Sequence, residues 1–309
     1  MHIPVLLNEI ITVLGIKPGA KVIDATFGGG GYGKILGKLA GPAGKVLGID
    51  ADTEAVTKAK ALKELSKNVT VVSGNFRNIV SLAEKQGLKE VDAIVFDLGL
   101  SSNALDNPDR GFSFQLSGPL DMRFNTSQAL TAANIVNDFS EKELAEIFKE
   151  YGEEKLAARI ARAVVNSRNE SKIENTDQLR KIIDEAVPGK FKKFLVKTKS
   201  RIFQALRIKV NDELENLKLA LSSAFCLLGE KGKLAVVSYH SLEDRIVKQY
   251  FASLIKGCVC PPDFPTCVCG KKAQARAITR KPIIPDVTEL ANNNRARSAK
   301  LRAVEKLTS

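Results

Sequence analysis

The chain has 309 residues, more than one compact domain usually needs, so we expect a second folded unit or a large insertion. Hydrophobic residues make up 44% and charged residues 27%, an ordinary globular composition that excludes disorder as the main state. Lys and Arg outnumber Asp and Glu by 47 to 35, and the net charge of +12 favours polyanionic partners such as RNA, DNA or an anionic membrane surface.

Two features of the sequence bear on its compartment. No apolar run reaches the roughly 18 residues that span a bilayer, and residues 1–14 lack the basic start and cleavage site of a signal peptide. We therefore expect a cytoplasmic protein with no membrane partner. There the five cysteines would be reduced, so clustered ones indicate metal binding or catalysis rather than disulfides.

The first part of the chain alternates strands with helices. Such alternation predicts an α/β fold of Rossmann-like type, with a mostly parallel, doubly wound sheet. The predicted elements are a strand at 21–26, a helix at 34–39, a strand at 45–50, a helix at 52–65, and strands at 69–73 and 91–97.

The alternation stops between about residues 103 and 199, where only loop and helix signals occur. Ser140 and Glu143 have capping-box spacing, and a short helix is expected at 177–187, before Pro188 and Gly189. We therefore predict an inserted all-helical domain. The predicted boundaries are 1–105 for the first part of the α/β domain, 106–200 for the insert and 201–309 for the second part.

The strand pattern returns in the last third of the chain. A long helix is predicted at 201–228, ending at Gly229, and a strand at 233–239. Ser241 and Asp244 have the spacing of a second capping box, which would open a helix to about residue 254. Segments 275–281 and 298–305 are expected to pair as an antiparallel edge.

A glycine-rich loop follows the first predicted strand. Gly28, Gly30 and Gly33 satisfy G-x-G-x-x-G, and the run from Gly28 to Gly31 removes every Cβ where backbone would approach a ligand. A tight strand-to-helix turn with no ligand is the alternative. Asp50, ending the second strand, favours a nucleotide site because its carboxylate can accept hydrogen bonds from both ribose hydroxyls.

Polar residues at the strand ends distinguish two cofactors. Asp24 and Thr26 end the first strand, where a carboxylate would repel the diphosphate of NAD but could orient water or the ammonium of a methionine moiety. Phe76, after the third strand, could flank adenine or simply pack in the core. Asp97, after the fourth strand, completes the predicted ligand edge of the sheet. These features favour S-adenosylmethionine over NAD.

The candidate catalytic residues lie next to that edge. Asp97, Ser101 and Ser102 place a carboxylate and two hydroxyls near the expected methyl group, where an amine nucleophile needs hydrogen-bond acceptors. Asp97 is the candidate acceptor, with a helix cap as the alternative. His240, after the fifth strand, is a candidate proton acceptor or a structural histidine.

Four of the five cysteines form a compact cluster. Cys258, Cys260, Cys267 and Cys269 have the pattern C-x-C-x₆-C-x-C. Four sulfurs suit tetrahedral zinc, which is the leading interpretation, while an iron–sulfur cluster or four unligated thiols remain open. Cys226 lies on an apolar predicted helix and is expected in the core.

Short motifs recur in order through most of the chain. They include His2-Ile-Pro-Val-Leu-Leu, Asp24-Ala-Thr-Phe-Gly-Gly-Gly-Gly, Gly48-Ile-Asp-Ala-Asp52, Asp97-Leu-Gly-Leu-Ser-Ser102, Asp109-Arg-Gly-Phe-Ser-Phe114, Gly118-Pro-Leu-Asp-Met-Arg123, Ser238-Tyr-His-Ser-Leu-Glu-Asp-Arg-Ile-Val-Lys248 and Ala296-Arg-Ser-Ala-Lys-Leu-Arg302. With these motifs the chain resembles the MraW or RsmH type of ribosomal RNA methyltransferase, which makes N4-methylcytosine in the decoding region of bacterial 16S rRNA.

The resemblance implies a methyltransferase domain interrupted by a helical substrate-recognition domain. Its implied cofactor is S-adenosylmethionine, and its partner is 16S rRNA or the small ribosomal subunit, with a homodimer left open. Two positions depart from the family: Tyr32, where His is usual, and Ala104, where Gln is usual. The implied cofactor-site residues are Gly30, Gly31, Tyr32, Asp50, Phe76 and Asp97, to which the residue patterns add Asp24 and Gly28.

Basic residues in these motif blocks are candidate RNA contacts, because they flank the predicted ligand edge. Each could instead be a solvated surface charge. A cytosine in structured RNA must also be splayed out to meet a methyl donor. An NAD-dependent oxidoreductase and a non-catalytic RNA-binding protein are the competing interpretations. The candidate contacts are Arg110, Arg123, Arg207, Arg245, Arg280, Lys281, Arg295 and Arg297.

Overall fold

The computed structural model of the protein describes residues 4–62, 64–100, 102–258, 260–261, 264, 266 and 268–308, without the side chains of 102 and 103. Its contacts divide the chain into two compact units. Unit 1 comprises Met1–Gly99 and Leu214–Ser309, and unit 2 comprises Leu100–Glu213. Within the described part of the chain, no helix is long and apolar enough to cross a membrane.

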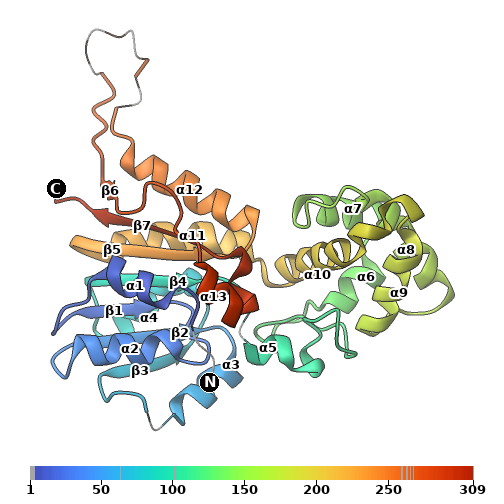
Figure 1. The fold of residues 1–309 in the computed structure, drawn as a ribbon, viewed down its shortest axis with the longest axis horizontal. Coiled ribbons are helices and arrows are strands. Elements are labelled where there is room, and N and C mark those ends of the chain that lie inside the picture. The colour runs from blue at the N-terminus through green and yellow to red at the C-terminus, as the bar shows by residue number, and fades with distance from the viewer. Residues whose placement is uncertain are drawn as a thin grey trace. The chain divides into compact units, whose positions relative to one another are not determined.

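Unit 1 is built on a seven-stranded sheet, with the strands in the order β3-β2-β1-β4-β5-β7-β6 (Figure 1). The first five strands are parallel, whereas β7 runs antiparallel to both β5 and β6. This confirms the predicted α/β class and the antiparallel edge near the end of the chain. The strands are β1 (Lys21–Asp24), β2 (Lys45–Asp50), β3 (Val69–Ser73), β4 (Val91–Asp97), β5 (Leu228–Ser238), β6 (Ala275–Ala277) and β7 (Lys300–Lys306).

Helices cover both faces of this sheet, and the alternation of side chains along the strands decides which residues each face buries. Ile94 and Phe96 of β4 belong to one buried cluster, while Ala93 and Val95 of the same strand belong to another. The first face packs against α4 (Ile79–Lys85), α11 (Glu213–Leu227) and α12 (Ser241–Ile255), and the second against α1 (Leu7–Leu14) and α2 (Gly31–Ala40). The helices α3 (Thr53–Lys60) and α13 (Val287–Asn292) complete unit 1.

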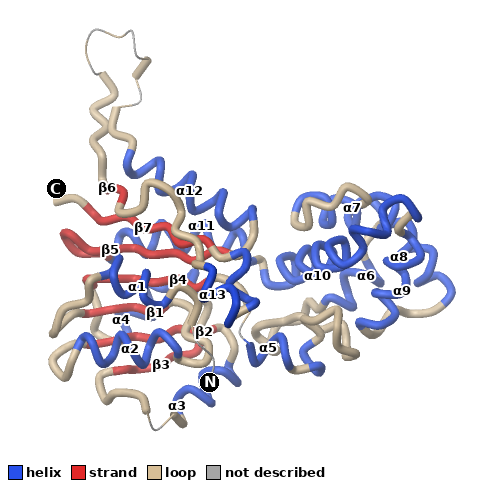
Figure 2. The backbone as a smooth tube through the Cα atoms, in the orientation of Figure 1, coloured by secondary structure: helices blue, strands red, loops and turns tan. Residues whose placement is uncertain are grey.

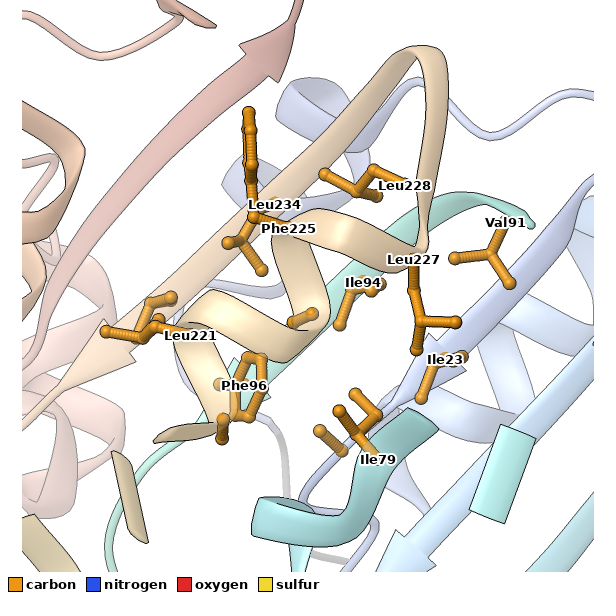
Figure 3. Close-up of a cluster of buried hydrophobic side chains, with 14 of the residues drawn as sticks. Ile23, Ile79, Val91, Ile94, Phe96, Leu221, Phe225, Leu227, Leu228 and Leu234 are labelled. Atoms are coloured by element: carbon orange, nitrogen blue, oxygen red, sulfur yellow. The ribbon is translucent and has the colours of Figure 1, made fainter. Parts of the chain in front are cut away.

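The larger cluster fixes the strands that end at the candidate site. Phe96 is fully buried beneath Leu221 and Phe225 of α11 (Figure 3). Ile79 of α4 and Ile23 of β1 extend this apolar layer. Fully burying each side chain of this size contributes about 1.5–3 kcal/mol. The strand ends are therefore held by a rigid core directly behind them.

Unit 2 is all-helical, as predicted, and Figure 2 colours its regular elements as helix. The capping box at Ser140 is confirmed, because its side chain accepts the Glu143 amide at 3.3 Å while the Glu143 carboxylate accepts the Ser140 amide at 2.8 Å. The helices are α5 (Ser102–Asp106), α6 (Ala132–Asp138), α7 (Glu141–Glu150), α8 (Ala157–Glu170), α9 (Thr176–Ala186) and α10 (Leu195–Asn211).

The long helix predicted at 201–228 is wrong, because two helices occupy this region. Asp212 lies between α10 and α11 in the left-handed conformation, with φ of 52°. Asp tolerates this conformation better than most residues because its short polar side chain can hydrogen-bond locally. The units divide at Glu213 and Leu214, so unit 2 extends farther at both ends than the predicted insert.

Candidate cofactor and catalytic site

Three carboxylates lie at the ends of adjoining strands in unit 1. Asp50, Asp24 and Asp97 are the last residues of β2, β1 and β4, which are neighbours in the sheet. Because these strands are parallel, their carboxyl ends meet at one edge, where ligands bind in sheets of this kind. The structure thus brings together three of the acidic residues that the sequence predicted for the site.

The glycine loop joins β1 to α2 above this edge. Gly28 and Gly30 have positive φ angles of 51° and 77°, which side-chain-bearing residues rarely adopt. The Phe27 ring packs beneath the loop, so tightly that a Cβ on Gly33 would lie 2.1 Å from it. The third glycine of the motif therefore serves protein packing, whereas the first two shape the turn.

Asp50 holds the glycine loop in place. Its Oδ2 accepts the Gly28 amide at 2.6 Å, and its Oδ1 accepts the Asp52 amide at 2.8 Å. Burial raises the pKa of this carboxyl, while the amide hydrogen bonds oppose the rise. Each carboxylate oxygen has a second lone pair, so Asp50 can still accept hydrogen bonds from a ligand.

Asp24 is completely buried and only partly hydrogen-bonded. Its Oδ1 accepts the Thr26 amide at 3.3 Å, and its Oδ2 has no hydrogen-bond partner among the described residues. Burial, followed by the nearby charges of Asp97 and Asp50, raises the pKa of Asp24 to about 8. A positive group at this edge would stabilise the ionised form.

Asp97 is held from two neighbouring strands. Its amide donates to Thr26 Oγ1 at 2.6 Å, and its Oδ1 accepts the Tyr239 hydroxyl at 2.7 Å. Burial raises the pKa of Asp97 to about 7, although the hydrogen bond from Tyr239 works in the opposite direction. Asp97 therefore changes protonation near neutral pH, the range that suits a proton acceptor.

Tyr239 is a site residue that the sequence analysis missed. It follows β5, the neighbour of β4, and burial together with the Asp97 charge raises the pKa of its hydroxyl, which stays protonated. A signal existed, because Tyr239 lies between Ser238 and His240 in a motif already identified at the ligand edge. The motif therefore contained the residue that contacts Asp97.

His240 has a structural contact in addition to the role predicted for it. His240 is the N-cap of α12: its Nδ1 accepts the Glu243 amide at 3.4 Å, and its Nε2 lies 3.1 Å from Glu243 Oε1. The capping box is therefore His240 and Glu243 rather than Ser241 and Asp244, because the helix begins one residue earlier than predicted. Nε2 is buried and makes no hydrogen bond with a described residue, so the proton-acceptor role of His240 stays a prediction beside its capping role.

Other predicted site residues have mixed outcomes. Tyr32 is 4% exposed and its hydroxyl donates to the Val5 carbonyl, so its side chain belongs to the core. Phe76 is half-buried and meets Phe96 edge to face at 5.7 Å. Ala104 is buried in unit 2. Ser101 and the side chain of Ser102 lie outside the described residues.

Three of the predicted RNA-contacting arginines are engaged within unit 2. Arg110 is 9% exposed and donates to the carbonyls of Arg123 and Phe124. Arg123 binds both oxygens of Asp121 and two backbone carbonyls. Arg207 makes a two-point ion pair with Glu213 at 2.8 and 2.9 Å. These contacts give the three arginines structural partners, and their contact with RNA stays a prediction.

The remaining five basic candidates belong to unit 1. Arg245, Arg280, Lys281 and Arg297 are exposed, and Arg295 is half-buried. Such side chains can reach phosphates.

The predictions for the cysteines also have different outcomes. The Sγ atoms of Cys258, Cys260 and Cys269 all lie within 4.8 Å of one another, whereas Cys267 lies outside the described residues. Cys226 is exposed rather than in the core.

The sheet order, the glycine loop after β1 and the acidic residue ending β2 define a Rossmann-type nucleotide-binding fold. The model of the MraW methylase family matches residues 1–307, and the chain belongs to this family. It is thus a methyltransferase by family, as predicted, and the oxidoreductase alternative is set aside.

Sequence similarity to known proteins extends over nearly the whole chain. It is 47% identical over 306 residues to the ribosomal RNA small subunit methyltransferase H of Clostridium botulinum (strain Loch Maree / Type A3), covering 99% of each sequence. It is also 47% identical over 308 residues to the enzyme of that name from Carboxydothermus hydrogenoformans, covering 99% and 98%. A solved structure, a putative rRNA methylase from Clostridium thermocellum, covers 99% of this chain and 100% of its own, with 16% identity and a TM-score of 0.45.

Proposed function

We propose that the protein transfers a methyl group from S-adenosylmethionine to the N4 amine of a cytosine in the decoding region of 16S rRNA. One observation carries this proposal: Asp24, Asp50 and Asp97 form a group of acidic residues that makes no ion pair with any described residue. A sulfonium and an ammonium would supply the missing positive charge, whereas the diphosphate of NAD would be repelled.

Each part of the cofactor has a complementary residue. In this proposal the bare backbone of Gly28, Gly30 and Gly31 allows close approach, and the Asp50 carboxylate accepts hydrogen bonds from the ribose hydroxyls. Phe76 flanks the adenine, and the unpaired Oδ2 of Asp24 receives the ammonium. Tyr32 contributes through its backbone only, because its hydroxyl is already used within the protein.

Asp97 is the residue to which we assign proton acceptance. The bound cofactor supplies an electrophilic methyl group on sulfur. When the amine nitrogen took this methyl group, the sulfur would keep the electron pair of the broken bond, and Asp97 Oδ2 would accept the proton that the nitrogen loses. Tyr239 keeps Oδ1 occupied and so orients the carboxylate, while Ser101 and Ser102 remain candidates for contacts to the base.

The proposed substrate is more specific than the names of the relatives. Relatives at 47% identity are small-subunit rRNA methyltransferases, and the family resemblance adds the cytosine position. The exposed Arg245, Arg280, Lys281 and Arg297, with Arg295, would contact phosphates, and the helical unit would recognise the surrounding RNA. Such a substrate would place the enzyme in the cytoplasm. No step of this transfer uses a metal held by the cysteines of residues 258–269.

Mass mapping of methylated nucleosides in 16S rRNA tests the proposal. We expect cells without the protein to lack one N4-methylcytosine, which returns with the wild-type chain and not with Asp97→Asn. The matched control is Asp92→Asn, a carboxylate of the same strand whose side chain accepts the Lys21 amide at 2.7 Å, away from the strand's carboxyl end. Unchanged N4-methylcytosine in cells that lack the protein would overturn the assignment.

A further inference from the structure

The described residues between α12 and β6 form no apolar core of their own. None of its described residues between 256 and 274 is buried, and Phe264 and Val268 expose 51% and 71% of their surface. The base is closed where the Gln274 amide donates to the Leu254 carbonyl at 2.8 Å, and from there two arms run side by side away from the sheet (Figure 1). Because apolar packing cannot order these arms, their conformation needs another source of stability.

Thiols from the two arms converge beyond this base. Cys258 and Cys260 lie on the arm that leaves α12, and Cys269 lies on the arm that returns to β6. The Sγ atoms of Cys258 and Cys269 are 3.7 Å apart, far longer than the roughly 2.05 Å of a disulfide bond. The distance matches the edge of about 3.8 Å that follows for a tetrahedron with Zn–S bonds of about 2.3 Å.

The surroundings of the thiols also suit a metal. The Cys260 amide points at Cys258 Sγ from 3.4 Å, as amides do where they support thiolate ligands. Lys256, Lys271 and Lys272 are exposed on the same segment. Their positive charge would offset the net negative charge that a divalent ion carries with three thiolates.

We propose that this segment binds one structural zinc ion through Cys258, Cys260 and Cys269. Each thiol gives its proton to solvent as its sulfur binds, and no oxidation or reduction takes place. The metal ties the two arms together where side-chain packing does not. The site is separate from the methyl-transfer chemistry, so it stands or falls independently of the proposed function.

Metal analysis of the full-length protein, purified without chelator and dialysed after zinc addition, tests the site. We expect one zinc ion per chain in the wild type and its loss in Cys258→Ser and Cys269→Ser. Cys226→Ser is the matched control and should keep the metal, because this exposed thiol ends α11 outside the cluster. Circular dichroism should show that all three variants fold, because Cys226, Cys258 and Cys269 are all exposed.

Cobalt substitution examines the ligands without any assay of activity. Cobalt in place of zinc should give the strong thiolate charge-transfer and tetrahedral d–d absorption bands, weakened in Cys260→Ser. Should a serine variant fail to fold, protection of the wild-type thiols from alkylation by added zinc provides the same information. The proposal is overturned by a zinc-free chain after reconstitution, by iron with labile sulfide, or by a Cys258–Cys269 disulfide in the purified protein.

Discussion

The strand-end carboxylates of unit 1 and the arginines of unit 2 are charged groups in opposite situations. Asp24 is buried with one oxygen unpaired and a pKa raised to about 8. Arg123, in contrast, has its guanidinium bound to Asp121 and to two backbone carbonyls. A buried charge that the protein leaves unsatisfied indicates a ligand, whereas one that is fully bonded indicates architecture.

The largest expected effect follows from Asp97→Asn. This change keeps the side-chain shape but removes the proton acceptor, so kcat should fall roughly 10²–10⁴-fold. Single-turnover methylation of 16S rRNA would measure the loss, with calorimetry of S-adenosylmethionine binding as the control. Turnover within a few-fold of wild type would show that the carboxylate is not the acceptor.

Arg123→Ala tests the second group in this comparison, the arginines of unit 2. Removing its bonds to Asp121 and the loop carbonyls should lower the free energy of unfolding by about 1–3 kcal/mol in urea. Arg297→Ala, at an exposed position of unit 1, should change it by less than about 0.5 kcal/mol while weakening RNA binding at low salt. The opposite pattern, stability lost at 297 and kept at 123, would contradict the structural role of Arg123.

Tyr239→Phe should lower kcat about tenfold, because Asp97 loses the group that orients it. The hydroxyl also lowers the pKa of Asp97, so its removal should raise that pKa. The acidic limb of the pH–rate profile should therefore move to higher pH. A uniformly lower rate with the limb unmoved would mean that Tyr239 acts only through packing.

The smallest expected effect is the number of protons released when the cofactor binds. If a positive ligand lowers the pKa values of Asp97 and Asp24 from about 7 and 8, binding at pH 7 should release on the order of one proton. Calorimetry in buffers of different ionisation enthalpy measures this release. Binding of S-adenosylhomocysteine, which lacks the sulfonium charge, should release fewer protons. The affinity of the protein for S-adenosylmethionine should also rise as the pH increases toward 8. Equal release by both ligands would argue against charge pairing with the sulfonium.

The strand ends were predictable from the sequence, whereas side-chain partners were not. Parallel strands place their last residues at one edge, so the positions of Asp24, Asp50 and Asp97 followed from local patterns alone. The bond between Tyr239 and Asp97 joins residues 142 positions apart, and no local pattern specifies it. The ion pair between Arg207 and Glu213 was likewise not predictable, since charge alone does not reveal which partner an arginine binds.

The antiparallel strand β7 completes the sheet late in the chain. It pairs with β5, and its first residue, Lys300, lies opposite Ser238, 62 residues earlier. At synthesis rates of about 5–20 residues per second, β5 waits roughly 3–12 s for its partner. During that interval an apolar strand edge is open to other nascent chains. The last pairing of the sheet therefore forms only when synthesis is nearly complete, and the edge of β5 is exposed to aggregation until then.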